Sequence, residues 1–176
     1  RHDTVVVTVM ANLGFRRAME TTGIHVVETP VGDRYVLEAI ERGGFSLGGE
    51  QSGHVIFREI ASTGDGLLTG LVLTDVVARS DRPLSALASA AMTRLPQVLH
   101  NVRVAERVPG VADLLAAEIA AASEVLGADG RVLVRASGTE PLVRVMVEAT
   151  TAEQASAVAT DLASVVARRF GSDGDR

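Results

Sequence analysis

The sequence predicts two small domains of different class within 176 residues. Residues 1–95 alternate strand and helix patterns, which is typical of a three-layer α/β domain with a mostly parallel or mixed sheet. Residues 96–176 follow the order strand, helix, strand, strand, helix, which predicts an α+β domain whose antiparallel sheet carries its helices on one face. The composition changes at Leu95-Pro96, so we place the boundary between Thr93 and Gln97.

The first domain opens on Thr4–Val9, a run of β-branched residues typical of a strand buried on both faces. Further short apolar runs bounded by turn residues predict three more strands at Ile24–Glu28, Phe45–Leu47 and His54–Phe57. Helical patterns predict four helices at Leu13–Thr22, Arg34–Arg42, Leu67–Arg79 and Leu84–Arg94.

Residues at the ends of these patterns support the helix assignments. Asn12, Asp33 and Asp65 are suited to N-cap positions, where a side-chain oxygen accepts a hydrogen bond from a free backbone N–H. Pro83 fits the first position of the fourth helix, because proline lacks the N–H that would stay unpaired there.

The second domain begins with the alternating strand Val98–Val104. An Ala/Leu/Glu helix over Val111–Leu126 ends at a glycine. Two strands follow, Val132–Ala136 and Leu142–Glu148, and Thr151 is placed to cap a last helix, Ala152–Phe170.

Bulk composition excludes several classes of function. Hydrophobic residues make up 47% of the chain and aromatic ones 3%, so the cores must be aliphatic. The formal charge of −5 argues against a general nucleic-acid binder, which needs a net basic face. The first apolar run is far shorter than the ~20 residues of a membrane span. The absence of cysteine excludes disulfides and thiolate chemistry and is consistent with a cytoplasmic protein.

The loop between the last two strands, Arg135-Ala-Ser-Gly-Thr-Glu-Pro141, combines a cation, two hydroxyls and a glycine. A guanidinium matches two phosphate oxygens at once, and glycine allows successive N–H groups to face an anion. Arg144 on the next strand could add a second cation. The loop alone supports an anion site and a plain β-hairpin turn equally.

A second glycine-rich loop, Gly48-Gly-Glu-Gln-Ser-Gly-His54, places a carboxylate, an amide, a hydroxyl and an imidazole together. A carboxylate accepts hydrogen bonds from two adjacent hydroxyl groups, so this set suits a sugar. Composition alone nevertheless favours a hairpin turn with solvated polar side chains.

The remaining polar residues do not form a metal motif. His2, His25 and His100 show no ligand spacing, so we predict no metal site. The tail Asp173-Gly-Asp-Arg176 looks like the start of a carboxylate metal loop, but it lies at a terminus after the final helix, whereas Mg²⁺ needs rigidly held carboxylates.

Taken together, the two glycine-containing loops resemble the sugar-binding and phosphate-binding signatures of the α-D-phosphohexomutase superfamily. Three further stretches look like the same family: Thr4–Gly14, Val31–Val36 and Thr63–Leu67. The resemblance extends from about Thr4 to Phe170 and implies the third and fourth of four domains, the fourth being a TATA-box-binding-protein-like α+β domain.

The resemblance implies that Glu50, Gln51, Ser52 and His54 bind the sugar. It implies that Arg135, Ser137, Gly138 and Thr139 bind the phosphate that is not transferred, and we add Arg144 on physical grounds. The family's phosphoserine and its Mg²⁺-binding Asp-Gly-Asp-x-Asp-Arg loop belong to the first two domains. We therefore expect no catalytic residue in this chain, a cut within a longer protein, and no activity for the chain alone.

For the whole protein, the resemblance implies interconversion of glucosamine 6-phosphate and glucosamine 1-phosphate through a bisphosphorylated sugar, with Mg²⁺, in the cytoplasm. The expected partners are the phosphorylated hexosamine and the preceding domains of the same polypeptide, with neither nucleic acid nor membrane. Gln51 and His54 favour the glucosamine branch. The alternatives are a phosphomannomutase or phosphoglucomutase, or a stand-alone phosphosugar-binding module without activity.

Overall fold

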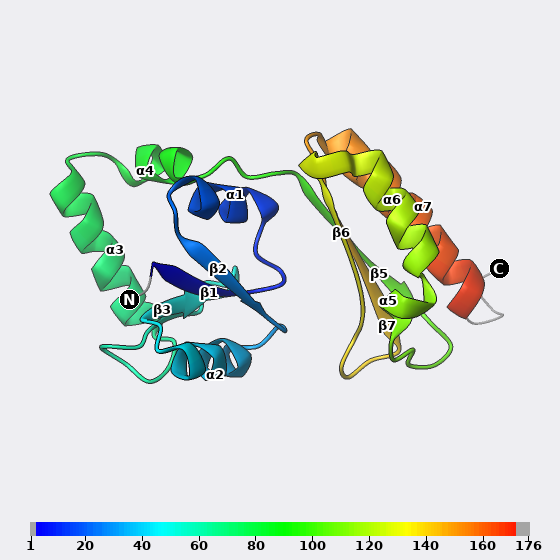
Figure 1. Cartoon of the computed structure of the whole chain (residues 1–176), viewed down its shortest axis with the longest axis horizontal. Helices are drawn as coiled ribbons and strands as arrows, with labels where there is room; N and C mark the ends of the chain where they lie inside the picture. Colours follow the sequence, from blue (N-terminus) through cyan, green and yellow to red (C-terminus); the bar gives the residue numbers. More distant parts are fainter. Residues whose placement is uncertain (1–2, 172–176) are drawn as a thin grey trace. The chain divides into compact units, whose positions relative to one another are not determined.

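The computed structural model describes residues 3–171. The chain divides between Arg94 and Leu95 into two compact units, and each has its own sheet (Figure 1). None of the helices in the described part is both long and apolar enough to span a membrane.

The first unit contains a four-stranded mixed sheet in the order β2-β1-β3-β4. Its strands are β1 (Thr4–Thr8), β2 (His25–Thr29), β3 (Leu47–Gly49) and β4 (Val55–Phe57). β1 pairs in parallel with both β2 and β3, and β4 is antiparallel to β3. The predicted mostly parallel or mixed sheet is therefore confirmed.

Two helices cover opposite faces of this sheet, as the buried β-branched first strand predicts. Val5 and Val7 form a core with partners on and around α1 (Leu13–Thr21). Val6, which faces the other way, packs with Val36 and Ile40 of α2 (Asp33–Gly43). The unit thus has the predicted three layers, helix, sheet and helix.

The prediction for the third strand was wrong by two residues. Phe45–Leu47 was expected, but β3 covers Leu47–Gly49, so two glycines assigned to the loop belong to the sheet. An added Cβ at Gly48 would lie 2.7 Å from the Val6 carbonyl oxygen and 2.8 Å from Ile40 Cδ1. Glycine is needed here because β3 is tightly enclosed between β1 and α2.

Replacing Gly48 with alanine should lower the free energy of unfolding of the first unit by about 1–3 kcal/mol, because the methyl group overpacks this contact. Urea denaturation measures the change. Gly70→Ala is the matched control, since nothing lies within 4 Å of a Cβ at Gly70 and alanine favours the helix. Equal stabilities for the two variants would contradict the packing argument.

Three of the predicted N-caps are confirmed. Asn12 Oδ1 accepts from the Gly14 N–H at 3.0 Å, Asp65 Oδ1 accepts from the Leu68 N–H at 3.0 Å, and Thr151 Oγ1 accepts from the Gln154 N–H at 3.2 Å. The fourth was wrong: Gly32 is the N-cap of α2 and Asp33 is its first helical residue. Gly32 has φ 135°, a conformation that favours glycine.

The last two helices of the first unit are α3 (Gly66–Ser80) and α4 (Leu84–Ala91). Pro83 occupies the N-cap of α4 rather than its first helical position, and α4 ends three residues before the predicted Arg94. Met92 is extended, and the Thr93 carbonyl oxygen lies where a side chain at Gly14 would be. Residues 92–94, predicted as the last turn of the helix, are therefore not helical, and Thr93 packs closely against Gly14 of α1.

The second unit is a three-stranded antiparallel sheet in the order β5-β7-β6. Its strands are β5 (Gln97–Arg103), β6 (Arg131–Ala136) and β7 (Leu142–Glu148), and its helices are α5 (Val111–Leu114), α6 (Ala116–Leu126), the 3₁₀ turn η1 (Gly127–Asp129) and α7 (Ala152–Phe170). The helices pack on one face of the sheet, as predicted (Figure 1). Val143, Val145 and Val147 of β7 form the centre of this core.

One helix predicted in the second unit is divided into two helices in the structure. Val111–Leu126 was expected to be continuous, but the helix is broken at Leu115, where φ is −114° and ψ is 19°. Both Val111 and Leu115 are buried in the core. Short-range helix propensity does not report such a break, because core packing causes it.

Candidate functional site

The helix-free face of the second sheet has three cross-strand rows that include all three strands, in addition to the Arg103–Leu142 pair of β5 and β7. The register places Gln97, Glu148 and Arg131 in one row, Leu99, Met146 and Leu133 in the next, and Asn101, Arg144 and Arg135 in the third. The valines of β7 alternate with these residues and face the helices. The third row lies beside the Ser137–Pro141 loop.

Arg135 and Arg144 are direct cross-strand neighbours on this face. Burial lowers the pKa of the Arg135 guanidinium, and the positive charge of Arg144 lowers it further. The Nε of Arg144 is buried without a hydrogen-bond partner among the described residues. Two like charges placed directly opposite each other are unfavourable, so the pair suits a bound anion.

The adjoining loop is anchored at Ser137, which is 3% exposed. The Ser137 N–H donates to the Leu142 carbonyl at 2.8 Å, and its hydroxyl accepts from the Glu140 N–H at 3.3 Å. Ser137 comes two residues after Arg135. Because side chains alternate along a strand, its side chain is expected on the same face of the sheet as Arg135. The structure therefore brings the predicted Arg135, Ser137 and Arg144 into one region.

Gly138 and Thr139 lie at the exposed tip of this loop. Gly138 is not among the residues with positive φ, and a Cβ there would meet nothing within 4 Å. Neither the turn nor the packing inside the chain therefore requires glycine at this position.

In the first unit, the predicted sugar residues form the loop of the β3–β4 hairpin. The Glu50 N–H donates to the His54 carbonyl at 2.8 Å, and the Gly53 N–H donates to the Glu50 carbonyl at 3.0 Å. Gln51 and Ser52 are exposed at the tip. The loop follows the carboxyl end of β3, the edge at which ligands bind in open α/β sheets.

Two contacts join this loop to the N-terminus of α2. Glu50 Oε1 accepts from the Gly32 N–H at 3.0 Å, and His54 Nε2 lies 3.7 Å from Asp33 Oδ2. Sequence reasoning assigned Asp33 only a helix cap and missed its place beside His54. The Gly-Asp pair at residues 32–33 was the sequence feature that could have indicated this role. The contact itself joins residues about 20 positions apart and arises only when α2 packs beside the hairpin.

His54 also contacts the turn that precedes α3. A Cβ added at Gly64 would overlap the His54 imidazole ring. The His54 imidazole thus packs directly against the backbone of Gly64, within the Thr63–Leu67 stretch. Asp65 of the same stretch caps α3, as predicted.

No group of three His, Cys, Asp or Glu side chains in residues 3–171 is arranged to hold a metal ion. The described residues therefore do not fit a Mg²⁺ site. His2 and the Asp173–Arg176 tail lie outside the described residues.

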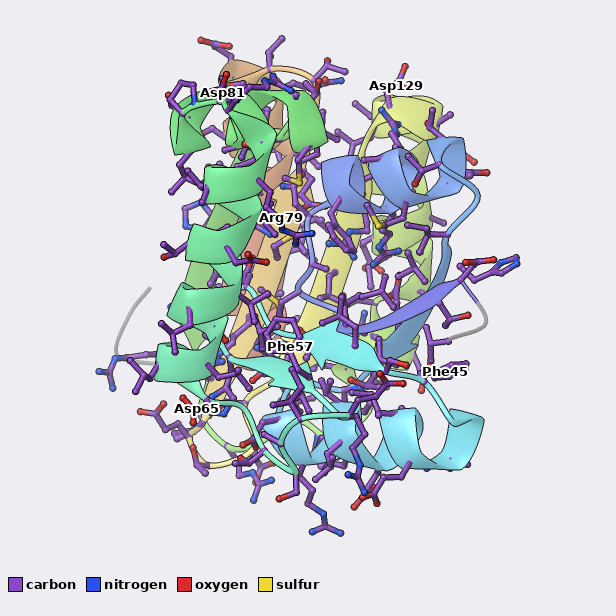
Figure 2. All side chains as sticks on the ribbon, turned by 90° about the vertical axis from the view of Figure 1, so that its left-hand side faces the viewer. Phe45, Phe57, Asp65, Arg79, Asp81 and Asp129 are labelled. Atoms are coloured by element: carbon purple, nitrogen blue, oxygen red, sulfur yellow. The ribbon has the colours of Figure 1, made fainter. Side chains whose placement is uncertain are left out.

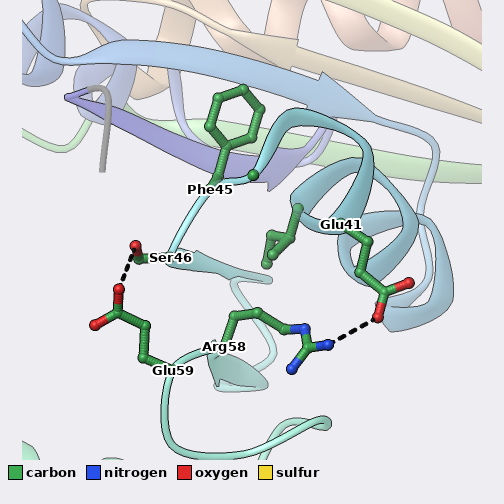
Figure 3. A pocket seen from close by; sticks show the side chains of 7 residues that line it. Glu41, Phe45, Ser46, Arg58 and Glu59 are labelled. Carbon is green, nitrogen blue, oxygen red and sulfur yellow. Dashed lines mark hydrogen bonds and ion pairs between the residues drawn. The ribbon is translucent and has the colours of Figure 1, made fainter.

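A separate pocket of about 390 Å³ lies at the other end of the β3–β4 hairpin (Figure 3). Arg58 donates to Glu41 Oε1 at 3.3 Å, and the Ser46 hydroxyl donates to Glu59 Oε1 at 3.3 Å. Its polar groups thus interact with one another, and we assign it no ligand.

Comparison with known families gives two matches. Residues 1–95 match "Phosphoglucomutase/phosphomannomutase, alpha/beta/alpha domain III". Residues 99–165 match "Phosphoglucomutase/phosphomannomutase, C-terminal domain".

Curated relatives are similar over almost the whole chain. A phosphoglucosamine mutase of Frankia alni is 61% identical over 165 residues, which cover 93% of this chain and 36% of the relative. A phosphoglucosamine mutase of Streptomyces coelicolor is 58% identical over 97% of this chain and 38% of its own length. The chain thus spans little more than a third of the length of these relatives.

Solved structures share the fold. The Aspergillus fumigatus N-acetylphosphoglucosamine mutase, in complex with GlcNAc-6P and magnesium, matches with a TM-score of 0.78 and 26% identity over 93% of this chain and 38% of its own. A variant of an Aspergillus fumigatus enzyme of the same name, in complex with glucose 1,6-bisphosphate, matches with a TM-score of 0.80 and 25% identity over 96% and 39%.

Proposed function

Because the chain belongs to the phosphoglucomutase/phosphomannomutase family and spans its domain III and C-terminal domain, we propose that it is the sugar- and phosphate-binding part of a phosphoglucosamine mutase. The reaction would interconvert glucosamine 6-phosphate and glucosamine 1-phosphate through a bisphosphorylated sugar. The 61% identity to a phosphoglucosamine mutase carries the choice of glucosamine over mannose or glucose.

We propose that Arg135, Ser137, Gly138, Thr139 and Arg144 bind a sugar phosphate. The support is the pair of arginines on neighbouring strands next to an anchored loop, one of which has a buried Nε without a hydrogen-bond partner in residues 3–171. A phosphate dianion would neutralise the repulsion within the pair and accept bidentate hydrogen bonds. Close approach of the phosphate to the Gly138 N–H would account for a glycine that the chain itself does not require.

We propose that Glu50, Gln51, Ser52 and His54 bind the sugar, with Glu50 accepting from two neighbouring hydroxyl groups. The Gly32 N–H donates to Glu50 Oε1, and a carboxylate can accept several hydrogen bonds, so Glu50 retains accepting capacity. The position at the carboxyl edge of the parallel strands also supports this role.

Neither loop supplies a group that transfers phosphate. The loops would bind and orient the sugar phosphate, which is a large part of what a protein contributes to phosphoryl transfer. We therefore propose that the donor group and the Mg²⁺ ligands belong to other domains of the family polypeptide, and that this chain alone is inactive. A cytoplasmic location and a role in the supply of UDP-N-acetylglucosamine for peptidoglycan are part of the same proposal.

Helix α3 supports the proposal that further polypeptide completes the protein. Most of its residues are apolar, none of them is buried, and Leu67 and Leu71 are 77% and 62% exposed. Figure 2 shows the helix between its N-cap Asp65 and its C-cap Asp81. A large exposed apolar patch normally marks an interaction surface. We propose that the polypeptide preceding domain III in the family covers α3.

Replacing Glu50 with glutamine should weaken binding of glucosamine 6-phosphate about tenfold, because a charge-assisted hydrogen bond becomes a neutral one. The glutamine oxygen can still accept from the Gly32 N–H, so the free energy of unfolding should change by less than about 0.5 kcal/mol. NMR titration and urea denaturation separate the two effects. A loss of stability with unchanged affinity would contradict the sugar-binding role.

A further inference from the structure

We propose that Asp33 is the residue that selects an amino sugar, by pairing with the protonated 2-amino group of the substrate. The inference rests on the proposed function of the β3–β4 loop and names a further residue for it. It follows from the position of Asp33 beside His54, which the sequence did not reveal.

The first step is the position of the carboxylate. Asp33 begins α2, its Oδ1 accepts from the Arg34 N–H at 2.8 Å, and its Oδ2 lies 3.7 Å from His54 Nε2. The side chain is 53% exposed, so it is accessible to a ligand. The N–H of the neighbouring Gly32 donates to Glu50. Asp33 is thus close to both Glu50 and His54 of the proposed sugar loop.

The second step is the charge around it. The nearest guanidinium in sequence, Arg34, points along the helix and donates to Glu38 Oε1 at 2.7 Å. This hydrogen bond also raises the pKa of Arg34, and in the structure the guanidinium pairs with Glu38. Glu50 and Asp33 thus give this edge two carboxylates, and the His54 imidazole lies 3.7 Å from Asp33 Oδ2.

The third step is the chemistry of the substrate. Glucosamine 6-phosphate differs from glucose 6-phosphate at one position, where an amine replaces a hydroxyl group. The amine is largely protonated at neutral pH and donates three hydrogen bonds, whereas the hydroxyl is neutral. A carboxylate that does not pair with a guanidinium can bind the ammonium group more strongly than the hydroxyl group. Glu50 alone would bind the hydroxyl groups that the two sugars share and would not discriminate between them.

The test is an NMR titration of the ¹⁵N-labelled chain with glucosamine 6-phosphate, glucose 6-phosphate and inorganic phosphate. The shifts of the Glu50–His54 amides report the sugar loop, and those of Arg135–Thr139 report the phosphate loop. The native chain should bind glucosamine 6-phosphate about fivefold more tightly than glucose 6-phosphate, the size of an exposed ion pair.

In Asp33→Asn this preference should disappear, while the affinity for glucose 6-phosphate stays the same. Asparagine retains the oxygen that accepts from the Arg34 N–H, so α2 should remain intact. Glu41→Gln removes one negative charge at the other end of the same helix and should keep the preference.

Two results would overturn the inference, and they are distinguishable. If both sugar phosphates shift the Glu50–His54 amides and Asp33→Asn keeps the fivefold preference, the assignment of Asp33 is wrong and the proposed function stands. If neither sugar phosphate shifts those amides beyond the effect of inorganic phosphate, the sugar-binding role is wrong and the inference fails with it.

Discussion

Replacing Arg131 with methionine is expected to lower the free energy of unfolding of the second unit by about 3 kcal/mol or more. Arg131 Nε donates to Glu148 Oε2 at 2.9 Å, and their side chains are 14% and 0% exposed. Gln97 Nε2 donates to the other Glu148 oxygen at 3.0 Å. Loss of the guanidinium would remove a positive charge that directly contacts this fully buried carboxylate.

Urea denaturation measures this loss, and two further variants identify its cause. Arg131→Met combined with Glu148→Met should recover most of the stability, because apolar side chains often replace a buried ion pair at little cost. Arg103→Met, at an exposed position of β5 on the other side of β7, should change stability by less than about 0.5 kcal/mol. A double variant no more stable than Arg131→Met would show that packing of Arg131, rather than its charge, is what counts.

Replacing Arg135 with alanine should weaken phosphate binding about tenfold to a hundredfold, because a charge-assisted hydrogen bond contributes about 1.5–3 kcal/mol. In the absence of phosphate, the same variant should be as stable as the native chain or slightly more stable. The substitution removes a guanidinium that lies directly opposite Arg144 and whose charged form burial already disfavours.

Phosphate titration by NMR and thermal unfolding without phosphate test the two halves of this prediction. Arg168→Ala, at an exposed position near the end of α7, removes one positive charge elsewhere in the second unit and should leave phosphate affinity unchanged. Equal losses of affinity in the two variants would mean that net charge, rather than the arginine pair, attracts phosphate.

Local patterns predicted the architecture because each depends on neighbouring residues. The β-branched run at Thr4–Val9 encoded a strand buried on both faces, and Asn12, Asp65 and Thr151 marked helix starts through short-range hydrogen bonds. The errors came where tertiary packing decides. Gly48 and Gly49 form a strand because they pair with β1, and Leu115 breaks a helix in the core.

The candidate site was predictable as two loops but not as a geometry. Residue types at Glu50–His54 and Arg135–Thr139 indicated the chemistry. Strand register places Arg144 opposite Arg135, and the packing of α2 places Asp33 beside His54. Register and helix packing join residues far apart in sequence, so a local pattern does not report them.

The central proposal is that these two loops bind a phosphorylated hexosamine, and titration of the ¹⁵N-labelled native chain with glucosamine 6-phosphate tests it most directly. We predict saturable shifts of the amides of both Arg135–Thr139 and Glu50–His54, with inorganic phosphate shifting the first set alone. If the amides of one or both loops show no saturable shift at millimolar glucosamine 6-phosphate, the proposal is contradicted.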